Sequence, residues 1–376
     1  MPIKINFMLS VLLLVWLVSL QGVKADVVHD LYDANIAMDD QSQRNQNKAF
    51  SLALEQVLIK IRGNHDLLTH PKIKLAITKP TRFVRSYSYD IQGSQLYLVI
   101  SFDPQRVEDI IRSAGFPVWD KRRPDSLIWL AIESRDDSAR KIATPTEYSD
   151  IYQQLSDRAA KRGITLSFPL WDLGDVQSLG VYDVWGGFST QISQASERYA
   201  VPSILSARIY FIDNELYDVG QSDVGQSGIM TNAKPAGQWS ADWTMIEGGG
   251  LLAGQVQGAN PLIVAEGLID ALADQLSMKY AIDLSQIDQA DTKAQIVVNN
   301  INSLIYYSQA LTFLENMSVV NSATLIKLQG PRATFELDLL GDVGDLTNAF
   351  GLDNKISPVV DDFGQPVMGL EFFWVK

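Results

Sequence analysis

The 376-residue sequence contains no cysteine and only three histidines. The absence of cysteine excludes disulfides, thiolate nucleophiles, iron–sulfur clusters and cysteine-based zinc sites. Cations are in the minority as well, because 31 lysines and arginines stand against 44 aspartates and glutamates, for a formal net charge of −13. This balance argues against nucleic acid as a partner, since the chain has no excess of positive charge to displace counterions from phosphate.

Hydrophobic residues are abundant and make up 46% of the chain, which excludes a disordered protein. No glycine period or heptad repeat is present, so the chain is not fibrous. At roughly 100–200 residues per domain, the length predicts two or three domains that each bury their own core.

The first 25 residues have the three parts of a secretory signal peptide. Lys4 precedes an apolar stretch at residues 7–20, and Val23 and Ala25 place small residues at the −3 and −1 positions of a cleavage site. The alternative is an uncleaved membrane anchor, but the stretch is shorter than the roughly 20 residues that span a bilayer. We expect cleavage after Ala25 and a periplasmic mature protein without a further transmembrane span.

Residues 26–116 are predicted to form a first module in the order βααββα. Apolar and polar residues alternate in its first segment, which is typical of a half-buried strand, and helical spacing follows. The expected elements are strand 32–39, helices 43–62 and 74–78, strands 83–91 and 95–102, and a helix over residues 104–114.

Residues 117–124 are predicted to be a linker, because their two prolines cannot continue a helix and their cations favour solvent. Residues 125–288 are predicted to form a middle α/β sandwich, since a continuous apolar run precedes alternating helices and strands. The expected elements are strands 127–132, 164–168, 203–211, 238–246 and 251–257, and helices 148–162, 188–199 and one beginning at residue 260. A tandem repeat at residues 219–227 predicts a mobile hairpin tip.

Residues 289–352 are predicted to repeat the plan of the first module as βαββα. The expected elements are strand 294–298, helix 304–317, strands 320–328 and 333–340, and helix 342–350. Residues 353–376 are predicted to be a C-terminal tail with a candidate edge strand at residues 368–375. The net charges of +2, −12 and −5 over residues 26–124, 125–288 and 289–376 also favour three modules. The predicted fold class is therefore α+β, with βαββα-type modules on either side of a larger sandwich.

Four segments together resemble a known family. They are the helical pattern at residues 47–63, the strand pattern at residues 96–102, Gly237-Gln238-Trp239-Ser240-Ala241-Asp242-Trp243, and Met278-Lys279-Tyr280-Ala281. The sequence resembles the proteobacterial, Gram-negative exported family of unknown function numbered 2066, over most of the mature chain. In element order only, the middle module is similar to the N-terminal domain of the translocation protein TolB and to curli-secretion-type lipoproteins. Neither likeness implies an activity.

The histidines do not form a catalytic or metal-binding pattern. All of them precede residue 71, whereas a Ser–Asp–His hydrolase order needs a late histidine, and no G-x-S-x-G elbow is present. His65 and His70 with Asp66 could hold a metal weakly, but solvated loop histidines are the preferred interpretation. The third histidine is His29.

Two further motifs are better explained by structure than by chemistry. Gly248-Gly249-Gly250 begins a partial match to a dinucleotide-binding pattern, but strand-like residues follow where that pattern needs a helix, so we predict a hairpin turn. The adjacent carboxylates Asp39-Asp40 and Asp361-Asp362 point in opposite directions in extended chain and do not suggest a glycosidase pair. We expect no catalytic residues, no bound metal and no cofactor.

One cationic run stands out, with no acidic residue between Asp66 and Asp90. We call it the cationic patch; its members are Lys72, Lys74, Lys79, Arg82 and Arg85. A solvated helix face is the simplest interpretation, and the alternatives are a docking site for an acidic partner, anionic lipid, or the acidic middle module itself. A cluster of aromatics is expected to serve packing rather than sugar stacking; these are Trp171, Tyr182, Trp185 and Phe188.

The sequence thus predicts a non-enzymatic exported cell-envelope protein that acts through protein–protein interaction, in a scaffold or assembly role. One alternative is a soluble binding module for a small ligand or lipid, with a large apolar pocket as its signature. Another is a hydrolase of an envelope polymer that uses two carboxylates across a cleft.

Overall fold

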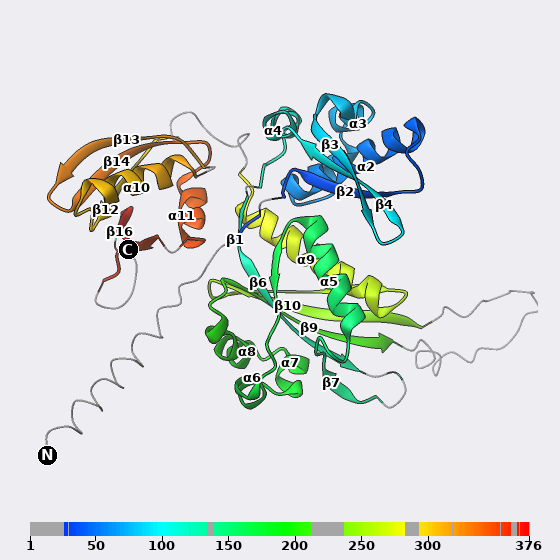
Figure 1. Cartoon of the computed structure of the whole chain (residues 1–376). Helices are drawn as coiled ribbons and strands as arrows, with labels where there is room; N and C mark the ends of the chain where they lie inside the picture. The colour runs from blue at the N-terminus through cyan, green and yellow to red at the C-terminus, as the bar shows by residue number, and fades with distance from the viewer. Residues whose placement is uncertain are drawn as a thin grey trace, which may run out of the picture.

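A computed structural model gives the fold of residues 26–28, 30–119, 121–133, 135, 138–212, 237–282, 293–317, 319–353, 355–361, 367 and 369–375. The expected signal peptide, the tandem repeat, His29 and Asp362 lie outside these described residues. Figure 1 shows three groups of helices and strands, coloured blue to cyan, cyan-green to yellow, and orange to red along the chain. The fold is of the α+β type, as predicted.

The first module packs helices on one small sheet. Its strands are antiparallel in the order β2-β4-β3. Apolar residues from β2, α2, β4 and α4 form one buried cluster. The elements are β2 (Asp33–Met38), α2 (Gln43–Arg62), η1 (Asp66–Thr69), α3 (Pro71–Ile77), η2 (Pro80–Arg82), β3 (Val84–Gln92), β4 (Gln95–Phe102) and α4 (Pro104–Ser113).

The middle module is a three-layer sandwich. Its sheet has the order β11-β10-β9-β6-β7, with β8 also paired to β6. Helices α5 and α9 cover one face with a large apolar core, and α6, α7 and α8 cover part of the other face. The strands are β6 (Asp125–Glu133), β7 (Arg140–Ile142), β8 (Thr165–Ser167), β9 (Ser203–Ile212), β10 (Gln238–Glu247) and β11 (Gly250–Gly258). The helices are α5 (Ser149–Arg162), α6 (Leu173–Ser178), α7 (Val181–Gly186), α8 (Ser189–Ser196), η3 (Glu197–Tyr199) and α9 (Pro261–Tyr280).

The third module repeats the topology of the first. Its strands β13, β14 and β12 are antiparallel neighbours, in the same relation as β3, β4 and β2. The elements are β12 (Lys293–Asn299), α10 (Leu304–Glu315), β13 (Val320–Gln329), β14 (Arg332–Leu339), α11 (Val343–Gly351), β15 (Ile356–Pro358) and β16 (Glu371–Trp374). The matching order of strand and helix patterns in the sequence therefore corresponds to a matching strand order in space.

The C-terminal residues differ from the expectation of a tail with an edge strand. β16 pairs in parallel with β12 and antiparallel with β15, so it lies inside the five-stranded sheet. Phe372 and Trp374 are buried in the core of the third module. The C-terminal segment is thus part of this module, because its apolar side chains complete the core.

Most other differences concern short elements. The sequence pattern missed the short helices α6 and α7 and the short strand β7, which are too brief to show a period.

The predicted helix starts fit well, since Asp103 accepts from the Arg106 N–H at 3.2 Å and Asn260 from the Ile263 N–H at 3.0 Å. The glycine turn is also confirmed, since Gly248 and Gly249 adopt positive φ between β10 and β11. Among the described residues, no helix is both long and apolar enough to cross a membrane.

Candidate functional site

The cationic patch runs from α3 through Lys79, which precedes η2, and η2 itself to the start of β3, and all five of its side chains are exposed. The local fold has clear causes. Pro71 and Pro80 each begin a short helical segment, and the His70 imidazole accepts from the Lys72 N–H at 3.3 Å to cap α3. The sequence places these cations close together along the chain, and the fold leaves them in solvent.

No member of the cationic patch forms an ion pair with another described residue. Lys72 donates to the Ser113 carbonyl at 2.5 Å, and Arg85 donates to the Ser101 hydroxyl at 2.9 Å; both acceptors belong to the same module. The alternative in which the cationic patch packs on the acidic middle module is not what the structure shows. Two of that module's carboxylates, Asp270 and Asp274, pair with its own arginines instead.

The linker differs most from its prediction. We expected solvated cations at residues 117–124, but the Arg123 side chain is fully buried, with 0% exposure. Its guanidinium donates to the carbonyls of Lys60 at 2.5 Å, Gly163 at 2.7 Å, Arg162 at 3.0 Å and Trp119 at 3.2 Å. It also lies 3.9 Å from the centre of the Trp119 ring. A guanidinium has five N–H donors, so backbone carbonyls can satisfy much of its hydrogen bonding in a buried position.

The neighbouring Arg122 points to the third module. Both arginines form strand β5 (Arg122–Arg123), which pairs with β1 (Asp26–Val27), and successive side chains of a strand point to opposite sides. Arg122 lies 5.2 Å from the Phe313 ring and 3.8 Å from the Asp353 carboxylate. The two linker arginines therefore contact all three modules.

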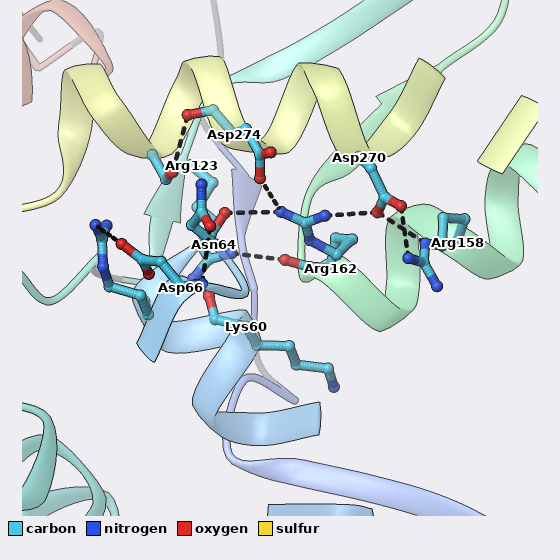
Figure 2. Close-up of polar contacts among 11 residues, drawn as sticks. Lys60, Asn64, Asp66, Arg123, Arg158, Arg162, Asp270 and Asp274 are labelled. Carbon is cyan, nitrogen blue, oxygen red and sulfur yellow. Dashed lines mark hydrogen bonds and ion pairs between the residues drawn. The ribbon is translucent and has the colours of Figure 1, made fainter. Parts of the chain in front are cut away.

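Arg162, at the end of α5, continues the buried network and is 1% exposed. It donates to Asp270 at 2.5 Å, to Asp274 at 2.6 Å and to the Gly63 carbonyl at 2.7 Å, while Arg158 holds Asp270 with two further hydrogen bonds (Figure 2). Burial pushes the pKa of Asp270 upward, but the hydrogen bonds and charges of the two arginines outweigh it, so the pKa lies below its ordinary value.

Lys60 of α2 lies at the edge of the same network. We call this network the buried junction; its members are Lys60, Arg123, Arg158, Arg162, Asp270 and Asp274. The Lys60 ammonium donates to the carbonyls of Asp33 at 2.8 Å and Asp30 at 3.2 Å. Burial and, to a lesser extent, the charge of Arg123 lower the pKa of Lys60 from 10.5 to about 8, against the opposing charges of Asp33 and Asp30. None of the residues of the buried junction was predicted from the sequence, because their partners are backbone carbonyls or side chains far away in the chain.

The lowered pKa predicts how stability changes with pH. Between about pH 8 and 10.5 the unfolded chain keeps the Lys60 proton that the folded chain has released. The unfolded state then binds more protons, so stability rises with pH. We therefore compare the free energy of unfolding of the wild type with that of Lys60→Met. The difference between them should rise by up to roughly 3 kcal/mol across this window. Urea unfolding at several pH values measures this difference, and a flat or falling one contradicts the assignment.

The other candidate residues are dispersed. His70 packs on Phe116 with ring centres 5.7 Å apart. His65 precedes η1 with much of its surface in solvent, and burial of the rest lowers its pKa from the ordinary value. Among the described residues, no group of three or more histidines or carboxylates is arranged for a metal ion. Asp40 is exposed, and its carboxylate accepts from the Ser42 N–H at 2.8 Å, before α2.

The aromatic cluster divides into packed and exposed members. Trp171 meets the buried Trp129 edge-on at 5.1 Å, and Trp185 has the guanidinium of Arg140 4.4 Å from its ring centre. Tyr182 and Phe188 are largely exposed. Packing therefore explains two members of the cluster and leaves two on the surface, Tyr182 on α7 and Phe188 just before α8.

The described residues line cavities at three places considered next. The first, about 520 Å³, opens between α10 and the β13–β14 hairpin. Its lining is mainly apolar and consists of Ile301, Asn302, Ser303, Leu304, Tyr307, Leu325, Leu328 and Gly330. A second, about 110 Å³, is polar and lies beside Trp185, Arg208 and Asp242. The third is small and lies where α9, α11 and the linker meet.

The fold and site define an α+β protein of three modules joined at a buried charged junction. Two family models match it: residues 25–120 match a domain of unknown function, DUF8605, and residues 292–365 match DUF2066. The resemblance to family 2066 is thus confirmed, and the match lies in the third module. The segments that suggested the family lie outside it, and the first two of them lie in the DUF8605 match. A search of curated proteins found no match.

Proposed function

We propose that this is an exported, non-enzymatic protein of the cell envelope that acts by binding other proteins, in a scaffold or assembly role. The observation that supports it is the cationic patch: five exposed cations without an ion pair among the described residues, in a chain of net charge −13. Exposed charges of one sign steer a partner of opposite charge and set the rate of its association. The partner is accordingly an acidic envelope protein, and the predicted signal peptide supports a periplasmic location.

Replacing all five residues of the cationic patch with glutamine tests this proposal. Folding should be nearly unchanged, because each exposed charge contributes within about 0.5 kcal/mol. Capture of partners from crosslinked envelopes should fall, and its dependence on salt should flatten. The measurements are thermal unfolding and the yield of specific partners at low and high salt.

The matched control replaces five exposed cations elsewhere in the chain and should leave capture unchanged: Arg44, Lys48, Lys161, Lys327 and Lys355. Equal capture by the wild type and the patch variant at both salt concentrations contradicts the proposal. A large fall in melting temperature would instead show that the cations stabilise the fold.

A second candidate function rests on the 520 Å³ cavity of the third module. A mainly apolar pocket of this size is in the range of small-ligand sites, so a small-ligand or lipid binding module is the alternative. Saturable binding of a fluorescent fatty acid by the purified protein distinguishes it. The hydrolase alternative has less support, because none of the three cavities is lined by more than one carboxylate.

A further inference from the structure

The strand that follows the cationic patch is an open sheet edge. β3 pairs with β4 on one side, and in the described part of the chain no strand pairs with its other side. Residues 85–92 are all exposed. The register shifts once, between Val84 and Ser86, and is regular from there to Gln92. An edge of this length that stays regular is a template for another strand.

The turn after β3 shows which backbone groups face outward. Gln92 and Gln95 pair across a two-residue turn in which Gly93 has a φ of 63°. The closing pair of such a turn is hydrogen-bonded, and bonding then alternates along the ladder. The N–H and C=O groups of Tyr87, Tyr89 and Ile91 therefore point away from β4.

The side chains beside these groups are apolar or aromatic. Tyr87 is 50% exposed and Ile91 71% exposed. Both tyrosines are held from α2: Tyr87 packs on Phe50 with ring centres 5.2 Å apart, and the Tyr89 hydroxyl accepts from Gln46 at 3.0 Å. This part of the edge is fixed in place and still open to a partner.

The charged residues at the start of β3 are all positive. Lys79 and Arg82 lie within the five residues before β3, and Arg85 lies at the register shift between Val84 and Ser86. Asp90 lies at the opposite end, next to the hairpin turn. An extended partner would thus meet positive charge at the start of β3.

Two other sheet edges are less suited. β13 has two register shifts, between Val320 and Ser322 and between Leu325 and Lys327, and irregularities of this kind protect an edge. β2, the other edge of the first sheet, gives its Asp33 carbonyl to Lys60 at the buried junction.

We propose that β3 binds an extended, acidic segment of the partner protein as an added strand. This inference rests on the proposed function and names how the partner binds. The outward groups of Tyr87, Tyr89 and Ile91 form the ladder, apolar side chains of the segment lie beside the tyrosines, and its acidic end lies next to Arg82 and Arg85. Main-chain bonds provide affinity in this mode, and side chains provide specificity.

The probe is a fluorescent peptide of alternating valine and threonine that ends in three glutamates; a second peptide ends in three glutamines. The full chain should bind the first more tightly.

Tyr89→Thr and Tyr89→Pro both remove the ring, but only Tyr89→Pro removes the outward N–H, at a position where an edge strand tolerates proline. Anisotropy should show binding to Tyr89→Pro roughly tenfold weaker than to Tyr89→Thr. Changing Arg82 and Arg85 to glutamine should weaken binding of the glutamate peptide only.

Equal binding to the two Tyr89 variants overturns the inference. A doubled molecular mass in solution that Tyr89→Pro abolishes also overturns it, because a second copy would then occupy the edge. If Tyr89→Pro does not fold, hydrogen exchange of the wild type decides: the amides of Tyr87, Tyr89 and Ile91 should become protected by the peptide, and unchanged exchange contradicts strand addition. If the five-glutamine variant loses partner capture but Tyr89→Pro keeps it, the proposed function stands and this inference fails.

Discussion

Replacing Arg123 with alanine should lower the free energy of unfolding by about 3–5 kcal/mol, the typical cost of removing one member of a buried charged network. The substitution leaves buried carbonyls of Lys60, Arg162 and Gly163 without their donor and opens space beside Trp119. Each unsatisfied buried acceptor costs about 1–3 kcal/mol when nothing replaces its partner. Part of this loss is offset, because the Arg123 charge also lowers the pKa of Lys60.

Two controls separate the role of Arg123 from that of a positive charge in the linker. Arg123→Lys keeps the charge but has fewer, differently placed donors, so its stability should lie nearer to that of Arg123→Ala than to the wild type. Arg122→Ala should cost clearly less than Arg123→Ala, because it removes one ion pair of 3.8 Å with Asp353 and one ring contact with Phe313 rather than four hydrogen bonds. Urea unfolding measures all three, and proteolysis at residues 117–124 shows whether the modules separate. A loss below about 1 kcal/mol for Arg123→Ala would falsify the view that this residue holds the modules together.

The contrast between α2 and Arg123 shows what could be predicted from the sequence and what could not. Residues 43–62 were predicted as a helix with the observed bounds, because 20 residues of apolar spacing and a glycine stop act locally. The burial of Arg123 depends on carbonyls near residues 60 and 163, and every residue has a carbonyl. No residue type marks such partners, so a cation between prolines was interpreted as solvated.

The same reasoning applies to β16 and to the cationic patch. Three of the four residues of β16 pair with β12, more than 70 positions earlier in the chain, and a strand this short shows no reliable alternation. The cationic patch was found in the sequence because its members are close along the chain. Its position beside the open edge of β3 could not be predicted, since strand order is set by long-range pairing.

Gly63 carries the second large expected effect, at the contact between α2 and α9. It ends α2 with a φ of 77°, and a Cβ there would lie 2.1 Å from the Ser277 Cβ and 2.7 Å from the Trp119 ring. Strain at positive φ and overpacking each cost about 1–3 kcal/mol. We expect Gly63→Ala to lower the free energy of unfolding by about 2–5 kcal/mol.

Gly115 provides the matched control for this prediction. It has a φ of 81°, but no atom lies within 4 Å of an added Cβ, so Gly115→Ala measures the backbone strain without the clash. The difference between the losses in free energy of unfolding of the two variants is the steric cost of placing a Cβ between α2 and α9. Adding Ser277→Gly to Gly63→Ala removes the nearest clashing atoms and should recover part of that cost. The double variant should therefore be more stable than the sum of the two single effects predicts. Equal losses for Gly63→Ala and Gly115→Ala in urea unfolding would mean that the two helices separate freely, and that the buried junction does not fix the first module on the second.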